Sequence, residues 1–179
     1  MAVDKEGIIW IATQGGGVDA FDPVTEKFFN YRHTGKTQNE IMGNFIWSVF
    51  IDDNDDVWLG ISGKGVDKIE QATGKITHYY LQENGKEINQ ESDVRCLIDD
   101  KKGNIWAGVS NYGLARINKS NGKIKYFAAG ADPINGLSNN MPFDFLLTSE
   151  GTLWTATFGG GVNVFEENSE TFTYICLLY

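Results

Sequence analysis

The chain has 179 residues, of which 41% are hydrophobic and 22% are charged, and its formal net charge at pH 7 is −9. This composition is typical of a globular protein with a hydrophobic core, and it excludes a chain that stays disordered. The excess of acidic residues argues against nucleic acid and anionic membranes as partners, because proteins that bind them concentrate Lys and Arg on one face. We recognise no signal peptide and no uninterrupted apolar run of roughly 18 residues, the length that spans a membrane.

One motif recurs four times along the chain at a period of 48 residues. Asp stands six residues before the Trp of the first three copies, and Thr148 replaces it in the fourth. Gly stands three residues before the Trp, except in the second copy, where the residue is Asp55. We call a set of equivalent positions in the four aligned copies a column. Equal spacing of so many columns predicts a repeat architecture. The columns that never vary are Trp10, Trp58, Trp106, Trp154, Gly17, Gly65, Gly113 and Gly161.

Each copy is predicted to form four short strands separated by Gly, Asn and Asp turns. The first copy, residues 1–40, begins with only a stub of its first strand. The second copy, 41–88, has apolar and β-branched segments at 46–52, 57–61, 66–70 and 76–81. The third and fourth copies, 89–136 and 137–179, repeat this order, and the fourth ends after its last strand. No window of helical length keeps a period of 3.6 residues, so the chain is predicted to be all-β.

A four-stranded antiparallel unit that repeats every 40 to 50 residues predicts the blades of a β-propeller. We therefore expect about 3.7 blades in a single propeller segment over residues 1–179. The Trp column would pack between blades, the Gly column would allow positive φ or close backbone approach, and the Asp column would bond its own turn. So few blades predict either a partial propeller or half of a ring that a second copy closes.

These residues carry a resemblance to a known family. The pattern D-x-x-G-x-[ILV]-W-x-[AG]-[TS], the GG[VL] and TGK segments and the GLSNN at 136–140 resemble the two-component regulator propeller repeat. The resemblance implies the periplasmic sensor region of an inner-membrane hybrid histidine kinase, of the kind with which gut Bacteroidetes detect glycan fragments. Such sensors contain far more blades, and no kinase core is seen here. We thus expect a sensor segment or a shortened homologue, which pairs with a second copy or with neighbouring blades.

Columns that vary between copies are free to serve a ligand, because blade packing constrains the columns that recur. Near the start of the first strand, one such column holds Trp47, Arg95 and Phe143, and another holds Phe45, Asp93 and Met141. Aromatic rings beside Arg and Asp suit sugar rings and acidic groups, although a structural role is favoured for these residues, as ordinary lining of the propeller channel or as filler between blades. The inter-blade segments 32–43, 82–91 and 128–139 form a second candidate surface, for a ligand or for an interface.

Several patterns that suggest chemistry favour structural roles instead. Asp52, Asn54 and Asp56 alternate like a calcium loop, but the Gly and the closing Glu of such a loop are absent, so we expect a simple turn. His33 and His78 fall in or after the fourth strands of separate blades, which argues against a shared metal site or a catalytic pair. Cys96 is expected to be a buried structural thiol; neither it nor Cys176 has a CxxC partner. No Gly-rich phosphate loop precedes a helix, so we expect no cofactor and no metal.

The sequence thus predicts a non-enzymatic sensor propeller that responds to an oligosaccharide. Two alternatives remain. One is a scaffold propeller that binds only other proteins. The other is an enzyme similar to the streptogramin lyases, which share the Asp-x-x-Gly…Trp repeat but need a His near the propeller channel.

Overall fold

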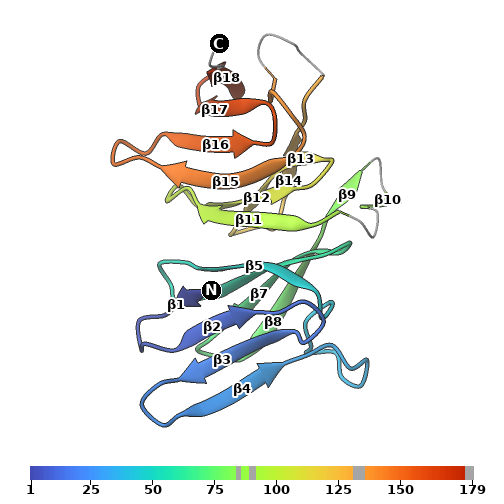
Figure 1. The fold of residues 1–179 in the computed structure, drawn as a ribbon, viewed down its shortest axis with the longest axis vertical. Coiled ribbons are helices and arrows are strands. Elements are labelled where there is room, and N and C mark those ends of the chain that lie inside the picture. Colours follow the sequence, from blue (N-terminus) through green and yellow to red (C-terminus); the bar gives the residue numbers. More distant parts are fainter. Residues whose placement is uncertain (84–85, 89–91, 131–135, 176–179) are drawn as a thin grey trace. The chain divides into compact units, whose positions relative to one another are not determined.

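The computed structural model describes residues 1–83, 86–88, 92–130 and 136–175. None of these residues is helical, and they form four four-stranded antiparallel sheets and one two-stranded hairpin (Figure 1). In every four-stranded sheet the spatial order of the strands follows the chain order. The prediction of an all-β chain of propeller-like blades is therefore confirmed. The chain divides into two compact units, Met1–Val94 and Arg95–Tyr179, and each contains two of the four-stranded sheets.

The first unit contains the sheets of the first two repeats. Turns rich in Gly, Asp and Asn separate its strands, as the sequence predicts. A short hairpin, β9–β10, follows the second sheet inside the segment that was expected to be a loop. The strands are β1(Ala2–Val3), β2(Ile9–Ala12), β3(Val18–Asp22), β4(Lys27–Tyr31), β5(Ile46–Ile51), β6(Val57–Ile61), β7(Gly65–Glu70), β8(Lys75–Tyr80), β9(Gln82–Glu83) and β10(Lys86–Glu87).

The second unit repeats the same arrangement with the third and fourth copies. Its division from the first unit falls at the first residue of β11. The strands are β11(Val94–Asp99), β12(Asn104–Val109), β13(Gly113–Asn118), β14(Ile124–Phe127), β15(Pro142–Leu147), β16(Leu153–Thr157), β17(Gly161–Glu166) and β18(Thr171–Ile175).

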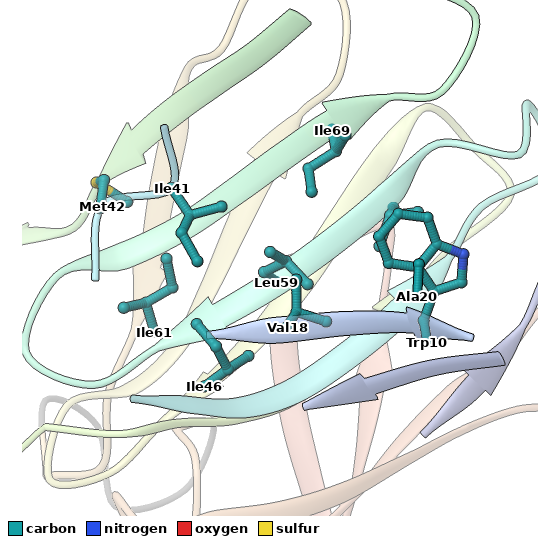
Figure 2. Close-up of a cluster of buried hydrophobic side chains, with 10 residues drawn as sticks. Trp10, Val18, Ala20, Ile41, Met42, Ile46, Leu59, Ile61 and Ile69 are labelled. Atoms are coloured by element: carbon teal, nitrogen blue, oxygen red, sulfur yellow. The ribbon is translucent and has the colours of Figure 1, made fainter. Parts of the chain in front are cut away.

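The core of the first unit lies between its two sheets (Figure 2). Trp10 and Val18 on the first sheet pack with Leu59 and Ile69 on the second, and all four are at least 98% buried. Ile41, from the segment that joins the two sheets, enters the same cluster. Each fully buried side chain of this size contributes about 1.5–3 kcal/mol of hydrophobic free energy. The apolar columns of the repeat therefore hold the two sheets face to face.

The core of the second unit is richer in aromatic rings. Trp106 stacks on Phe127 of its own sheet, with ring centroids 5.1 Å apart, and meets Phe165 of the next sheet edge-on at 4.8 Å. Phe172 adds a further edge contact to Trp106. Edge-to-face aromatic pairs are each worth about 0.5–1.5 kcal/mol beyond the area they bury. The role predicted for the Trp column, packing between blades, is confirmed at Trp106.

The fourth Trp departs from this pattern. Trp10, Trp58 and Trp106 are at least 98% buried, whereas Trp154 is only half-buried. The aromatic ring that stacks on each of the first three, at 5.1–5.3 Å, is replaced by Ile175 in the fourth sheet. All four copies thus form the same kind of four-stranded sheet, but the fourth lacks the aromatic ring that packs on the Trp of the other three.

Candidate functional site

Three of the predicted ligand residues belong to the first unit. Phe45 and Trp47 flank the first residue of β5, where a bulge shifts the register between Ile46 and Ser48. Their side chains are 58% and 39% exposed. Phe45 also lines a cleft of about 400 Å³ beside the β6–β7 turn. The full lining is Gly43, Asn44, Phe45, Ile61, Ser62, Gly63 and Lys64.

Asp93 differs from its two predicted partners because it is buried. It accepts a hydrogen bond of 2.7 Å from Ser62 Oγ in the β6–β7 turn. A buried carboxylate that is already bonded within the protein holds the turn in place. Its role is thus to support the wall of the Phe45 cleft.

The other two predicted residues, Arg95 and Phe143, meet in the second unit. The Arg95 guanidinium lies 5.2 Å from the centroid of the Phe143 ring, within the range of a cation–π contact. Ser110 Oγ accepts a hydrogen bond of 2.6 Å from Arg95 Nε, which fixes the side chain. Phe143 stacks in turn on Phe158, with centroids 5.9 Å apart and planes at 30°. Both rings remain exposed, by 47% and 63%.

Phe158 is not among the ligand residues predicted from the sequence. It stands in the turn after β16, in the column that holds Ser62 and Ser110 in the two preceding copies. That column varies between copies as much as those of Trp47 and Phe45, so the same criterion would have found it. Met141 contributes through its backbone, because its carbonyl accepts a hydrogen bond of 2.8 Å from the Phe158 N–H. We call Arg95, Phe143 and Phe158 the aromatic platform.

His33 and His78 lie in or after the fourth strands of separate blades, a placement that suggested they would be far apart, but the structure brings them together. Both line one pocket of about 230 Å³ in the first unit. Segment 32–43 brings them together, because it folds back over the second sheet. Asn39 secures the segment by donating from Nδ2 to the Gly74 carbonyl at 2.9 Å and accepting at Oδ1 from the Ile76 N–H at 2.9 Å. We call this the histidine pocket; it is lined by His33, Thr37, Gln38, Glu40, Ile41, Met42, Lys64, His78 and Tyr80.

A buried carboxylate anchors His78 in this pocket. Asp67 on β7 is fully buried, and its Oδ1 lies 2.6 Å from His78 Nδ1 on the neighbouring strand β8. Oδ2 accepts a hydrogen bond of 2.6 Å from the Met42 N–H, which ties segment 32–43 to the sheet. The hydrogen bond with Asp67 raises the pKa of His78 above the ordinary value of 6.5. Burial raises the pKa of the Asp67 carboxyl, whereas its hydrogen bonds with His78 and with the Met42 N–H lower it. With Asp67 ionised the carboxylate only accepts, so Nδ1 carries a proton and Nε2 is the nitrogen left for other partners.

Glu40 is the other acidic group of the pocket. Its carboxylate accepts hydrogen bonds from Thr34, Gly35 and Thr37, and the bonds from Thr34 contribute most to lowering its pKa to about 2. His33 Nδ1 lies 3.0 Å from the Ile41 carbonyl, an acceptor, so Nδ1 donates and Nε2 is again the nitrogen left over. The acidic groups of the pocket are thus already occupied by protein donors.

The turn interpretation of Asp52, Asn54 and Asp56 is confirmed. Asp52 Oδ1 accepts from the backbone N–H groups of Asn54 and Asp56 at 2.9 and 3.1 Å, and Asp56 forms an ion pair of 2.7 Å with Lys68. Cys96 is buried, as predicted, whereas Cys176 lies outside the described residues, as do parts of segments 82–91 and 128–139. Across the described ranges, no group of three or more His, Cys, Asp or Glu side chains could hold a metal. Within the same ranges no helix has the length and apolarity to cross a membrane.

Comparisons with known proteins give matches at the level of the fold. No protein-family model and no curated protein matches the chain. The extracellular domain of the hybrid two-component system BT3049 of B. thetaiotaomicron is similar, with a TM-score of 0.76, 22% identity, and coverage of 94% of this chain and 22% of that one. The extracellular domain of BT4673 from the same organism gives a TM-score of 0.75, 20% identity, and coverage of 97% and 24%. An auxiliary nutrient binding protein of B. thetaiotaomicron gives 0.55 at 11% identity, with coverage of 94% and 45%.

The chain therefore spans about a quarter of the length of the two extracellular domains that it resembles. At these identities the likeness establishes a shared blade architecture. It agrees with the fold that the 48-residue repeat predicts.

Proposed function

We propose that the chain is a segment of an extracytoplasmic, ligand-sensing propeller in a two-component system, and that its role is binding rather than catalysis. The observation that carries the proposal is the aromatic platform. Arg95 is fixed by Ser110 over Phe143, and Phe143 is stacked on Phe158, so exposed rings are held in place before any ligand arrives. The fold shared with extracellular domains of such systems supports a sensor role outside the cytoplasm.

An oligosaccharide is the ligand that fits the platform best. The faces of exposed aromatic rings pack against the apolar faces of sugar rings, while an adjacent guanidinium donates hydrogen bonds to hydroxyl groups. A rigid site loses little conformational entropy when the ligand binds, which favours affinity. In the whole protein, which we propose to be a periplasmic sensor of an inner-membrane histidine kinase, the ligand would shift the balance between two arrangements by its difference in affinity for them.

The platform can be tested with the 179-residue chain and a panel of neutral oligosaccharides, by thermal shift followed by calorimetry. A ligand at 100 times its Kd stabilises the native state by about 2.7 kcal/mol, which raises the Tm measurably. We expect Phe143→Ala and Phe158→Ala to abolish the shift. Phe29→Ala, which removes a ring that is also exposed but lies on β4, is the matched control and should keep it. Loss of the shift in all three variants, or in none, would refute the platform.

We also propose that further blades cover the outer faces of the first and fourth sheets. On the first sheet Phe28 is paired with Phe21 and is 62% exposed. On the fourth, Leu146 is paired with Trp154 and is 61% exposed. The residues at the same repeat positions of the second and third sheets are half-buried: Phe50, Ile76, Ile98 and Ile124. The more exposed faces of the first and fourth sheets therefore favour another blade, from a second copy or from a longer chain.

Light scattering on a sizing column, over a range of concentrations, tests whether a second copy of the chain supplies the covering blades. A mass of about twice 19.9 kDa would support closure by a second copy. A monomer at every concentration would exclude it, and the covering blades would then belong to the same polypeptide.

A further inference from the structure

The histidine pocket and the Phe45 cleft share a wall. Lys64, in the β6–β7 turn, lines both of them. Its side chain is exposed, and no hydrogen bond or ion pair joins its ammonium group to another residue in the part of the chain that the structure describes. The Lys64 ammonium group is therefore shared by the histidine pocket and the Phe45 cleft.

The charges of the histidine pocket leave cationic donors for a ligand. The Glu40 carboxylate is held by the hydrogen bonds of Thr34, Gly35 and Thr37, and the Asp67 carboxylate is held by His78 and the Met42 N–H. Both anions are thus satisfied by groups of the protein. What remains is Lys64 Nζ and the Nε2 atoms of two imidazoles.

The donors that remain suit a carboxylate. The His78 imidazole is the better placed of the two, because Asp67 orients it and favours its charged form. A carboxylate that accepts from an ammonium and from an imidazolium makes two charge-assisted hydrogen bonds, which are about twice as strong as neutral ones. The chain as a whole carries a charge of −9, so this attraction is local, and salt screens it beyond about 8–10 Å.

The adjoining cleft supplies an apolar surface. Phe45 is 58% exposed, and its ring lies against Gly15, whose added Cβ would come within 3.6 Å of the ring. Gly43 lines the same cleft, and an added Cβ there would lie 3.1 Å from the Ile61 side chain, so the absence of a side chain keeps the cleft open. A sugar ring placed against Phe45 would lie beside Lys64.

We propose that the two clefts form one site for an acidic saccharide, whose carboxylate binds Lys64 and His78 and whose sugar ring packs on Phe45. The inference deepens the proposed function and rests on it in one respect, namely that the ligand is a saccharide. It concerns a place in the first unit, whereas the aromatic platform lies in the second.

The test is isothermal titration of the 179-residue chain with sodium D-glucuronate, D-glucose and sodium phosphate at the same ionic strength. We expect glucuronate to bind at least tenfold more tightly than glucose or phosphate. Lys64→Gln should weaken glucuronate binding about tenfold, and Phe45→Leu should weaken it to a smaller degree. Lys27→Gln removes an exposed lysine that lines neither cleft, and it should bind glucuronate as the parent chain does.

Each other outcome overturns a defined part of the inference. Phosphate binding equal to that of glucuronate would mean a simple anion site without a sugar contact. Equal losses in Lys64→Gln and Lys27→Gln would mean an effect of net charge alone. If glucuronate does not bind while a neutral oligosaccharide still shifts the Tm through Phe143 and Phe158, the acidic site is refuted and the sensor function stands. If neither sugar binds, both proposals fail.

Discussion

The indole Nε1 of Trp106 donates a hydrogen bond of 3.1 Å to Oδ2 of Asp100, and both side chains are buried. Oδ1 of the same carboxylate accepts from the backbone N–H groups of Lys102 and Asn104 at 2.8 and 3.0 Å. The Asp100 side chain thus closes a turn and also accepts from the indole N–H, the only polar group of the Trp106 side chain, which packs between sheets. The pairs Trp10–Asp4 and Trp58–Asp52 repeat the bond at 2.9 and 3.0 Å.

Restoring the missing member of this pair should stabilise the fourth sheet. Thr148 Oγ1 accepts a hydrogen bond of 3.1 Å from the turn N–H of Thr152. Thr148→Asp would provide a second oxygen for the Trp154 indole, and a net hydrogen bond of this kind contributes about 1 kcal/mol. We expect a rise of that size in the free energy of unfolding, measured by urea denaturation. Ser149→Asp adds the same charge one residue away; an equal gain there would contradict the explanation.

Two glycines with positive φ should respond differently to alanine. Gly7 has φ of +86° and open space around it, so Gly7→Ala costs only the backbone strain of about 1–2 kcal/mol. Gly17 has φ of +81°, and an added Cβ would lie 2.1 Å from the Tyr31 carbonyl oxygen. Gly17→Ala should therefore cost about 3 kcal/mol or more. Equal denaturation midpoints for the two variants would show that the close approach has no energetic consequence.

The His78–Asp67 pair predicts a loss of stability as the pH rises. The folded pKa of His78 is raised by its hydrogen bond to Asp67, so its contribution is complete below the unfolded value of about 6.5 and disappears as the pH passes the folded pKa. Urea denaturation of the parent chain and of His78→Gln should show a difference that is largest near pH 6 and shrinks at higher pH. His33→Gln is the control.

A difference between the parent chain and His78→Gln that does not change with pH would contradict the ion pair. NMR titration of the imidazole provides a direct second measurement of the His78 pKa, which its hydrogen bond with Asp67 raises. The titratable groups around His78 are Asp67 on β7, Tyr80 on β8, Lys64 in the β6–β7 turn, and His33 and Glu40 in segment 32–43.

Cys96 should be unreactive in the folded chain. It is buried, and burial raises the pKa of its thiol to about 12, so almost no thiolate exists at pH 8. In a Cys176→Ser background, we expect a thiol reagent to label Cys96 slowly in buffer and rapidly in urea. Fast labelling in buffer would mean that β11 opens readily, because the reagent needs an exposed thiolate.

The strands and the packing residues could be read from the sequence because both are local and repeated. A strand of the second copy predicted at 57–61 is β6, with the same bounds, since a short continuous apolar run and the turns at either end decide it. The Gly and Asp columns likewise predicted turn geometry, because a turn depends on only a few neighbouring residues. The bond from Asp to the indole was not predicted, although the constant spacing of six residues was its signal.

Relations between blades needed the tertiary structure. His33 and His78 are 45 positions apart, and they share a pocket because segment 32–43 folds over the next sheet through Asn39 and Met42. Arg95, Phe143 and Phe158 meet only when β11 and β15 belong to adjacent sheets of one unit. The period of 48 residues determined what each blade is, since hydrogen bonding and alternation act along a strand. Which side chains face one another across blades was decided by packing, because the contacts that bring them together are distant in the chain.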